Sequence, residues 1–311
     1  MSTDAAATPA IATGRPAKRR PQRAKLVRPK PGRAKPRLPG RLWNDVLGDR
    51  PLGGRFRAAR RILCVVVFTL LCIPVQGVLL QFSGPAKNHF ARFYFHTLCW
   101  LIGLKLRVIG RPPAGPRTLY VSNHTSWLDI LVLGATVDAR FVSKSEVADW
   151  PLIGWVAKLG RSVFVSRSRG RTGTEAQELR ARLDEGESLI LFPEGTTSDG
   201  ARVLPFRSSF FSVAGAASRI QPVTVVYDRL GGLPVGRRDR PLFAWYGDME
   251  TGSHAWRLLR RTGTRVSVVL NEGFAPDAVP DRKAMAARVG RSVTETAAAL
   301  RQNREVMPRA A

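Results

Sequence analysis

From residue 105 onward the sequence predicts an α/β fold, a mixed, mostly parallel sheet flanked by helices. Strand-like and helix-like segments alternate there, which is the order that places parallel strands between covering helices. Two of the strand-like segments end in a polar turn, one carrying His124 and the other Glu194. Before this region lies a charge-free apolar run, Ile62–Phe82, which predicts a membrane-embedded helical segment preceding the sheet.

Strands are expected where short runs rich in β-branched or aromatic residues lie between turn residues. These runs are Leu106–Gly110, Thr118–Ser122, Arg140–Lys144, Ser162–Ser166, Ser188–Phe192, Pro222–Val226, Leu242–Tyr246 and Arg265–Leu270. Helices are expected from Ser126 onward, at Trp150–Leu159, at Thr174–Asp184 and at Asp281–Arg301. Thr174 and Gln177 have the spacing of a capping box, and Gly186 is a stop signal.

The segment Thr118–Ile130 predicts a strand, a polar turn and a helix. His124 follows the strand, Thr125 or Ser126 can cap the helix, and Asp129 lies about one turn into it. Ligands bind at the carboxyl ends of strands in open α/β sheets, so the two side chains are candidates for a general base and the carboxylate that orients it. A turn histidine beside a capping aspartate is the alternative.

A second motif, FPEGT at Phe192–Thr196, brings another carboxylate to the same predicted edge. Together with NHTSWLD at Asn123–Asp129, it resembles the glycerolipid acyltransferase family, the 1-acylglycerol-3-phosphate acyltransferases and their relatives. Two further blocks fit the same family: GRSVFVSRS at Gly160–Ser168 and QPVTV at Gln221–Val225. The resemblance extends roughly from residue 105 to residue 274 and implies a glycerol-3-phosphate acyltransferase-like fold.

The resemblance implies that His124 deprotonates an acceptor hydroxyl and that Asp129 holds the imidazole. Because no G-x-S-x-G motif occurs, direct attack of the acceptor on a thioester is the simpler chemistry. The residues expected to bind substrate are Lys144, Arg161, Arg167, Glu194, Gly195 and Thr196. The alternatives are a solvated basic face for the three cations and a turn-stabilising role for the carboxylate.

The expected reaction is acyl transfer from acyl carrier protein or coenzyme A to 1-acyl-sn-glycerol-3-phosphate, giving phosphatidic acid. One departure from the family motif weakens the case for a phosphate-bearing acceptor, because Thr197 occupies the position where the motif has arginine. Arg207 or Lys144 could supply the missing positive charge. The sequence after Thr197 resembles the lyso-ornithine-lipid acyltransferases, which gives a second acceptor. A non-catalytic protein that binds lipid or nucleic acid through its basic surface is the alternative of another class.

The net charge of +27 implies an anionic partner. Residues 1–61 are expected to form a disordered basic tail, with seventeen basic and three acidic residues. An anionic membrane surface suits this tail better than nucleic acid, because its most basic stretch, Arg15–Arg41, has no aromatic residue to stack on bases. The three cysteines lack metal-ligand spacing, so neither a metal site nor a cofactor is expected.

Residues 62–104 are expected to form membrane-embedded helices, residues 105–275 the catalytic domain, and residues 276–311 a closing helix and tail. A single span would put His124 on the far side of the membrane from thioester donors. The second apolar segment, Phe90–Gly103, and the interruption at Pro74 therefore favour a helical hairpin, with a single anchor as the alternative. The expected location is the inner membrane, with the catalytic domain on the cytoplasmic face.

Overall fold

The computed structural model describes residues 54–113, 115–144, 163–165 and 172–308. Every described residue belongs to a single unit, Arg41–Ala311. The expected disordered tail was residues 1–61, and residues 1–53 of it lie outside the described residues, as does the helix expected at Trp150–Leu159. Its last part, residues 55–61, is helical instead, because it belongs to the first turns of α2 (Arg55–Leu79).

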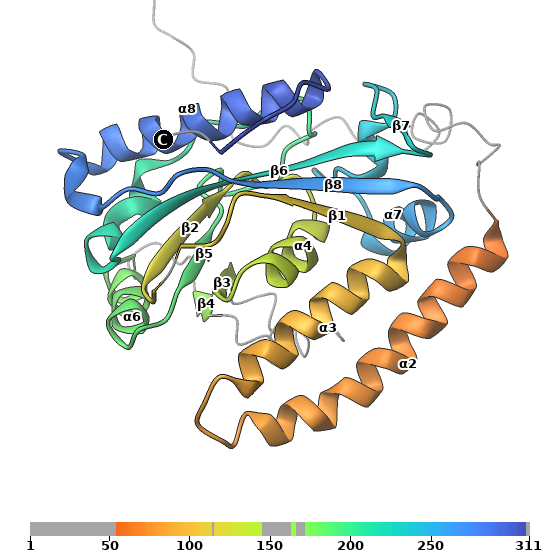
Figure 1. Cartoon of the computed structure of the whole chain (residues 1–311), viewed down its shortest axis with the longest axis horizontal. Coiled ribbons are helices and arrows are strands. Elements are labelled where there is room, and N and C mark those ends of the chain that lie inside the picture. Colours follow the sequence, from red (N-terminus) through yellow and green to blue (C-terminus); the bar gives the residue numbers. More distant parts are fainter. Residues whose placement is uncertain (1–53, 114, 145–162, 166–171, 309–311) are drawn as a thin grey trace, which may run out of the picture. The chain divides into compact units, whose positions relative to one another are not determined.

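The described part of the second unit is built on one mixed sheet (Figure 1). Its strands, in chain order, are β1 (Leu104–Ile109), β2 (Thr118–Ser122), β3 (Arg140–Lys144), β4 (Val163–Val165), β5 (Leu189–Leu191), β6 (Arg219–Leu230), β7 (Leu233–Pro234) and β8 (Thr264–Leu270). The spatial order is β1-β8-β6-β2-β5-β3-β4, with β7 paired to β6. All pairs are parallel except β6 with β8 and β6 with β7. The predicted mostly parallel sheet is thus confirmed.

One predicted strand is wrong. Leu242–Tyr246 is not a strand but follows a short 3-10 helix, η3 (Arg240–Leu242), into a loop. Leu242, Phe243 and Ala244 are buried there because Phe243 stacks on Tyr227, with ring centroids 5.1 Å apart. An apolar run in a sequence indicates that its residues are buried, but not that they form a strand. Here the residues are buried because they pack against one face of the sheet.

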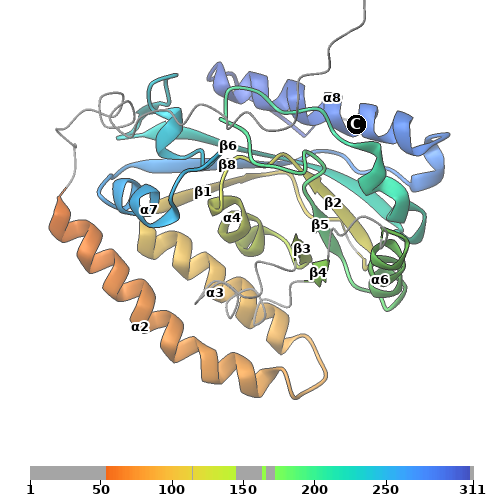
Figure 2. The same ribbon diagram turned by 180° about the vertical axis from the view of Figure 1, so that it is seen from behind.

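Helices cover both faces of the sheet, as Figures 1 and 2 show from opposite sides. One face packs against α3 (Ala86–Ile102), α4 (Leu128–Thr136) and α7 (Thr251–Leu259). The other packs against α6 (Thr172–Asp184), α8 (Arg282–Arg301) and the 3-10 helix η2 (Ser208–Ala216). A further 3-10 turn, η4 (Pro276–Ala278), precedes α8. β6 contributes side chains to both faces of the sheet. Val223 and Val225 belong to the apolar core on the α4 side, and Val226 packs with residues of α8 on the other side.

Two helix boundaries differ from expectation and two agree. α6 begins at Thr172, so Thr174 lies inside the helix and cannot be its N-cap. α4 begins at Leu128 with Trp127 as N-cap, two residues later than expected, and the expected contribution of Ser126 is a long hydrogen bond of 3.4 Å from the Leu128 N–H to Ser126 Oγ. The predicted stop at Gly186 is confirmed by its left-handed φ of 90°, and Asp281 caps α8 by accepting from the Lys283 and Ala284 N–H groups.

The apolar segments form an antiparallel pair of helices, α2 (Arg55–Leu79) and α3 (Ala86–Ile102). Tyr94 stacks on Phe68 and its hydroxyl lies 3.0 Å from Thr69 Oγ1, which fixes the pair in register. α2 extends further toward the N-terminus than the apolar run, because the guanidinium of Arg61 donates to the carbonyls of Leu259 and Arg261 after α7. By length and composition α2 is long and apolar enough to cross a membrane.

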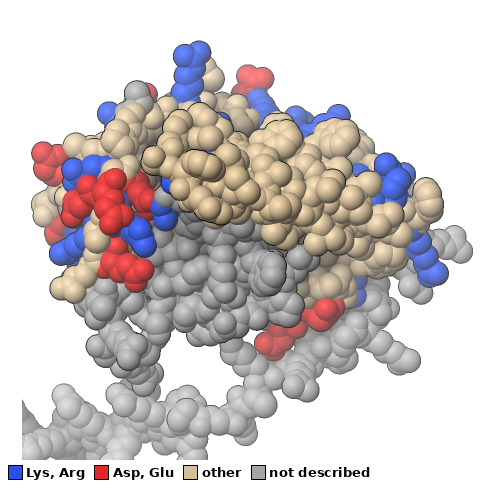
Figure 3. Space-filling model, turned by 90° about the horizontal axis from the view of Figure 1, so that it is seen from below, with Lys and Arg blue, Asp and Glu red and all other residues tan. Residues whose placement is uncertain are grey.

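The pair exposes large apolar side chains. Seen from below in Figure 3, a broad surface without acidic or basic side chains faces the viewer, and charged side chains lie toward its ends. The exposed apolar residues of α2, α3 and the turn between them are Phe56, Ile62, Leu63, Val66, Val67, Leu70, Leu71, Val75, Val78, Phe82, Phe93 and Trp100. A patch of this size on a soluble monomer is unusual and indicates contact with an apolar phase or partner.

Candidate active site

Two polar turns meet at one edge of the sheet, as predicted. β2 and β5 are parallel neighbours, with Val121 beside Leu191, so both strands end at the same edge. β3 is the parallel neighbour of β5 and ends there too, at Lys144. The turn after β2 carries His124, and the turn after β5 carries Glu194. We call residues 123–129 the catalytic loop.

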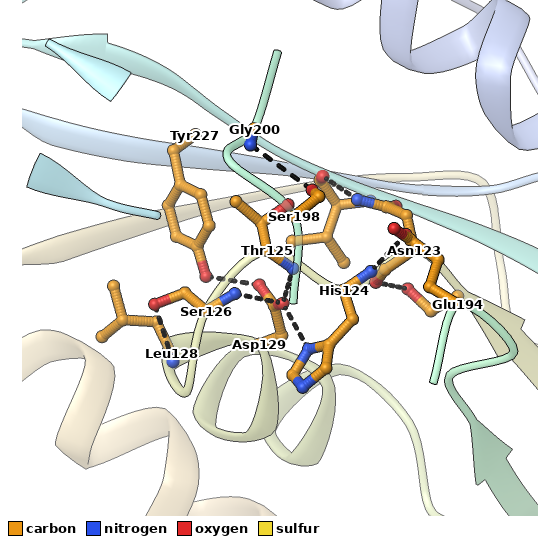
Figure 4. A network of polar contacts seen from close by, with 12 residues as sticks. Asn123, His124, Thr125, Ser126, Leu128, Asp129, Glu194, Ser198, Gly200 and Tyr227 are labelled. Atoms are coloured by element: carbon orange, nitrogen blue, oxygen red, sulfur yellow. Dashed lines mark hydrogen bonds and ion pairs between the residues drawn. The ribbon is translucent and has the colours of Figure 1, made fainter. Parts of the chain in front are cut away.

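Asn123 attaches the catalytic loop to β6 (Figure 4). Its side-chain amide donates to the Val225 carbonyl at 2.9 Å, and its Oδ1 accepts from the Val225 N–H at 2.8 Å. The amide thereby continues the ladder where β2 has ended. The Ser198 N–H also donates to the His124 carbonyl at 2.9 Å. These contacts fix the backbone from which the imidazole projects.

His124 and Asp129 form the predicted pair. His124 Nδ1 lies 2.9 Å from Asp129 Oδ2, which also accepts from the Thr125 and Ser126 N–H groups at 2.7 and 2.9 Å. The carboxylate is wholly buried, whereas the imidazole is 20% exposed. Because the carboxylate accepts from Nδ1–H, the lone pair is left on Nε2, which Figure 4 shows directed away from Asp129. An exposed basic nitrogen with a fixed tautomer is what general-base catalysis requires.

Tyr227 is a member of the site that the sequence did not reveal. Its hydroxyl donates to Asp129 Oδ1 at 2.6 Å, so both oxygens of the carboxylate are engaged. Burial raises the pKa of Tyr227 well above its usual value, which keeps the hydroxyl protonated and donating. The fourth sequence block ended at Val225, two residues short. The available signal was the strand period, which puts residue 227 on the same face as Val223 and Val225.

Phe192 was expected only as the end of a strand. Its ring stacks on the imidazole of His124, with centroids 4.1 Å apart and planes 19° apart. The stack restricts the orientation of the imidazole plane, in addition to the hydrogen bond to Asp129. The aromatic residue of the FPEGT motif therefore packs against one face of the imidazole.

Glu194 was expected to bind substrate, but both of its oxygens are occupied by the protein. Oε1 accepts from the His124 N–H at 2.8 Å and Oε2 from the Leu204 N–H at 3.0 Å. The side chain is 2% exposed, and this burial raises its pKa to about 7 against the opposing effect of the two hydrogen bonds. These are the contacts of the turn-stabilising carboxylate that was the alternative interpretation.

Gly195 and Thr196 complete this turn. Gly195 has a φ of 70°, and a Cβ there would lie 3.3 Å from the guanidinium of Arg207. Only glycine combines that conformation with that close approach. Its N–H donates to the Phe192 carbonyl at 3.0 Å, so it is not free to receive an oxyanion. Thr196 is exposed.

The three predicted cations are placed less completely. Arg161 and Arg167 lie outside the described residues, and for Lys144 the structure gives the backbone position at the end of β3.

Trp127 adds a contact that the sequence did not suggest, because its indole N–H donates to Nδ1 of the buried His254 on α7 at 3.1 Å. Burial lowers the pKa of His254 to about 4, so this ring is a neutral acceptor.

Known proteins share both the sequence and the fold of this region. The acyltransferase family model matches residues 105–227. A lyso-ornithine lipid O-acyltransferase from Brucella abortus is 40% identical over 242 residues, which cover 75% of this chain and 91% of that protein. One from Rhizobium meliloti is 36% identical over 74% of this chain and 82% of its own length. A 1-acyl-sn-glycerol-3-phosphate acyltransferase from Neisseria gonorrhoeae is 32% identical over 51% of this chain and 60% of its own.

The crystal structure of the 1-acyl-sn-glycerophosphate (LPA) acyltransferase PlsC from Thermotoga maritima has the same fold. It aligns with a TM-score of 0.60 and 19% identity, covering 80% of this chain and 99% of its own. The family resemblance drawn from the four motifs is therefore confirmed. On these relatives, and with the motif residues gathered at one sheet edge, the chain belongs to the PlsC-like acyltransferase family.

Proposed function

We propose that this protein transfers an acyl chain from a thioester to the free hydroxyl of a lysolipid. The observation that carries the proposal is the pair formed by the partly exposed imidazole of His124 and the buried carboxylate of Asp129 at the sheet edge. Nε2 removes the proton of the acceptor hydroxyl while its oxygen attacks the thioester carbonyl. The carbon–sulfur bond then breaks, and the imidazolium returns the proton to the leaving thiolate. An ester and a free thiol result, and Asp129 stabilises the imidazolium between the two steps.

The acceptor we propose is lyso-ornithine lipid. The relatives from Brucella abortus and Rhizobium meliloti are named for this acceptor and match about three quarters of the chain, whereas the Neisseria relative, named for 1-acylglycerol 3-phosphate, matches about half. The first expectation from the sequence was the phosphate acceptor, and this proposal reverses that order. Thr197 in place of arginine supports the reversal, because ornithine offers a carboxylate and an ammonium group where glycerol phosphate offers a phosphate.

The head group would be held by cations at the carboxyl ends of the strands. We assign this role to Lys144, Arg161 and Arg167 as expected from the motifs, and add Arg207, whose guanidinium packs against Gly195. Thr196 lies on the exposed side of the same turn. We assign Glu194 to positioning of the catalytic loop instead of substrate binding.

The membrane is the proposed location of the reaction. The exposed apolar side chains of α2 and α3 would enter the bilayer, and the basic N-terminal segment would contact anionic head groups. Thioesters of acyl carrier protein or coenzyme A are cytoplasmic, so we place the catalytic domain on the cytoplasmic face of the inner membrane.

The test is an acylation assay with both acceptors present at equal concentration in membranes that contain the protein. We expect ornithine lipid to form faster than phosphatidic acid, with either thioester as donor. His124→Ala should lower the rate by about 10²–10⁴-fold, the usual worth of a general base. His96→Ala, which removes an exposed histidine of α3, is the matched control and should leave the rate unchanged. Preferential acylation of 1-acylglycerol 3-phosphate would overturn the acceptor, and more than a tenth of the activity in His124→Ala would overturn the base.

A further inference from the structure

A small polar pocket lies beside the catalytic loop, whose Thr125 contributes to its lining. β6 continues past the end of β2, since Ser122 pairs with Val223 while β6 runs to Leu230. Beyond that point the β6 edge lines a partly open cavity of about 30 Å³. We call it the arginine pocket, and its lining includes Thr125, Gly200, Tyr227, Asp228, Arg240 and Arg301.

Two guanidinium groups share this pocket. Arg240 begins η3, and Arg301 ends α8, whose last turn lies at the β7 end of the molecule in Figure 1. Both side chains are half-buried. Burial, and after it the charge of Arg240, lowers the pKa of Arg301 to about 10. Within the described ranges, neither guanidinium has a hydrogen bond or an ion pair.

The carboxylates around the pocket are engaged elsewhere. Asp228 accepts from the guanidinium of Arg265 on both oxygens and from Ser267 on one. Glu194 is held by the two backbone N–H groups described above, and exposed Asp199 accepts from the Ala201 N–H at 2.9 Å. Among the described residues, none of these carboxylates forms an ion pair with Arg240 or Arg301, and Glu194 and Asp199 act on Arg301 only as nearby charges that raise its pKa against the effect of burial. Because partly buried charges are normally paired, the two guanidinium groups have donors left for an anion.

We propose that the arginine pocket binds a phosphate group. Each guanidinium presents a planar fork of N–H donors that matches phosphate oxygens, and two forks suit a dianion better than a single carboxylate. The pocket is partly open, so a compact anion can reach both side chains from solvent. The bound phosphate would lie against Thr125, whose N–H donates to Asp129, and so support the catalytic loop from the side opposite Nε2.

Phosphate binding is tested on the full-length chain in detergent micelles, without any acyl transfer. Inorganic phosphate is titrated against chloride at constant ionic strength, with calorimetry and the thermal unfolding midpoint as readouts. We expect saturable binding and a rising midpoint, as for any ligand of the folded state. Arg240→Gln and Arg301→Gln should each weaken binding at least tenfold, and the double variant should abolish it. Arg291→Gln, an exposed arginine of the same helix, is the matched control for loss of one positive charge and should bind like the wild type.

Two further variants protect the test against unfolding. Arg240→Lys and Arg301→Lys keep the charge but lose the forked geometry, so they should bind phosphate more weakly than the wild type and more tightly than the glutamine variants. No saturable response in the wild type, or equal binding by the double glutamine variant, would overturn the proposal. Competition then identifies the source of the phosphate. Displacement at lower concentration by coenzyme A assigns the site to the acyl donor, displacement by glycerol 3-phosphate assigns it to a lipid head group, and displacement by neither leaves free phosphate as the ligand.

Discussion

The catalytic loop and the α2–α3 pair solve opposite problems of burial. In the loop, a wholly buried carboxylate is surrounded by four donors, from His124, Thr125, Ser126 and Tyr227. In the helix pair, Leu71 is 65% exposed and Trp100 is 73% exposed. In the loop, protein groups supply all four hydrogen bonds to the carboxylate. In the helix pair, the rest of the chain leaves large apolar side chains exposed.

This difference shows where each region depends on its surroundings. Protein groups alone fix the geometry of His124, so the catalytic loop should keep its arrangement in detergent as in a membrane. The helix pair lacks the apolar environment that its exposed side chains require, and a bilayer supplies one. The three predictions below test this contrast, from the largest expected effect to the smallest.

A charge on the helix pair should reduce membrane binding. Leu71→Asp replaces a favourable apolar contact with a buried charge, which costs about 3–4 kcal/mol near the centre of a bilayer and corresponds to a loss of about a hundredfold or more in vesicle partitioning. Vesicle flotation measures it. Leu233→Asp is the control, because Leu233 is 71% exposed but lies on β7, away from the pair. If the two variants float alike, the exposed face of α2 does not enter the bilayer.

Removing the titratable group at Glu194 should flatten the dependence of stability on pH. Its pKa is raised from 4.5 to about 7 in the folded chain, so the folded state binds the proton more tightly than the unfolded state. The stabilisation is therefore complete below about pH 4.5 and is lost as the pH rises through about 7, a change of about 3 kcal/mol in the free energy of unfolding.

Urea unfolding in micelles at pH 5 and pH 7.5 checks this value for the wild type and Glu194→Gln. In the Glu194→Gln variant the free energy of unfolding should lose this dependence on pH, because glutamine does not titrate. Glu250→Gln, at the exposed N-cap of α7, should retain it. A wild-type slope that survives in Glu194→Gln would show that the slope comes from other groups.

Two tyrosines provide a matched pair across the regions. Tyr227→Phe removes the hydrogen bond to Asp129, and since a hydrogen bond to a charged group is worth about 1.5–3 kcal/mol, we expect kcat to fall by about tenfold or more with KM little changed. Tyr94→Phe removes the hydroxyl that contacts Thr69 in the helix pair and should leave kcat unchanged. Equal kcat in the two variants would demote Tyr227 to a packing residue. A shift of the acidic limb of the pH–rate profile in Tyr227→Phe alone would mark it as a positioning residue.

Local patterns in the sequence determined much of this protein. The spacing of His124 and Asp129 made them candidates for a contacting pair, and the FPEGT motif with its family resemblance favoured that pair over a turn histidine beside a capping aspartate. The glycine stop at Gly186 was predictable from local sequence too. The expectation that the turns of His124 and Glu194 meet at one edge required only that their strands be parallel neighbours.

Only the tertiary structure decided the partners that come from distant segments. Tyr227 of β6 donates to Asp129, and Phe192 in the turn after β5 stacks on His124. Arg240 of η3 and Arg301 of α8 line the same pocket. No sequence spacing predicts these contacts, because the partners lie far apart in the chain. They depend on how the strands of the sheet are paired and on where α8 crosses the sheet. The role of Glu194 changed for the same reason. Its residue type marks a carboxylate in a turn, but only the packed structure shows that both oxygens face backbone N–H groups, and burial then raises its pKa.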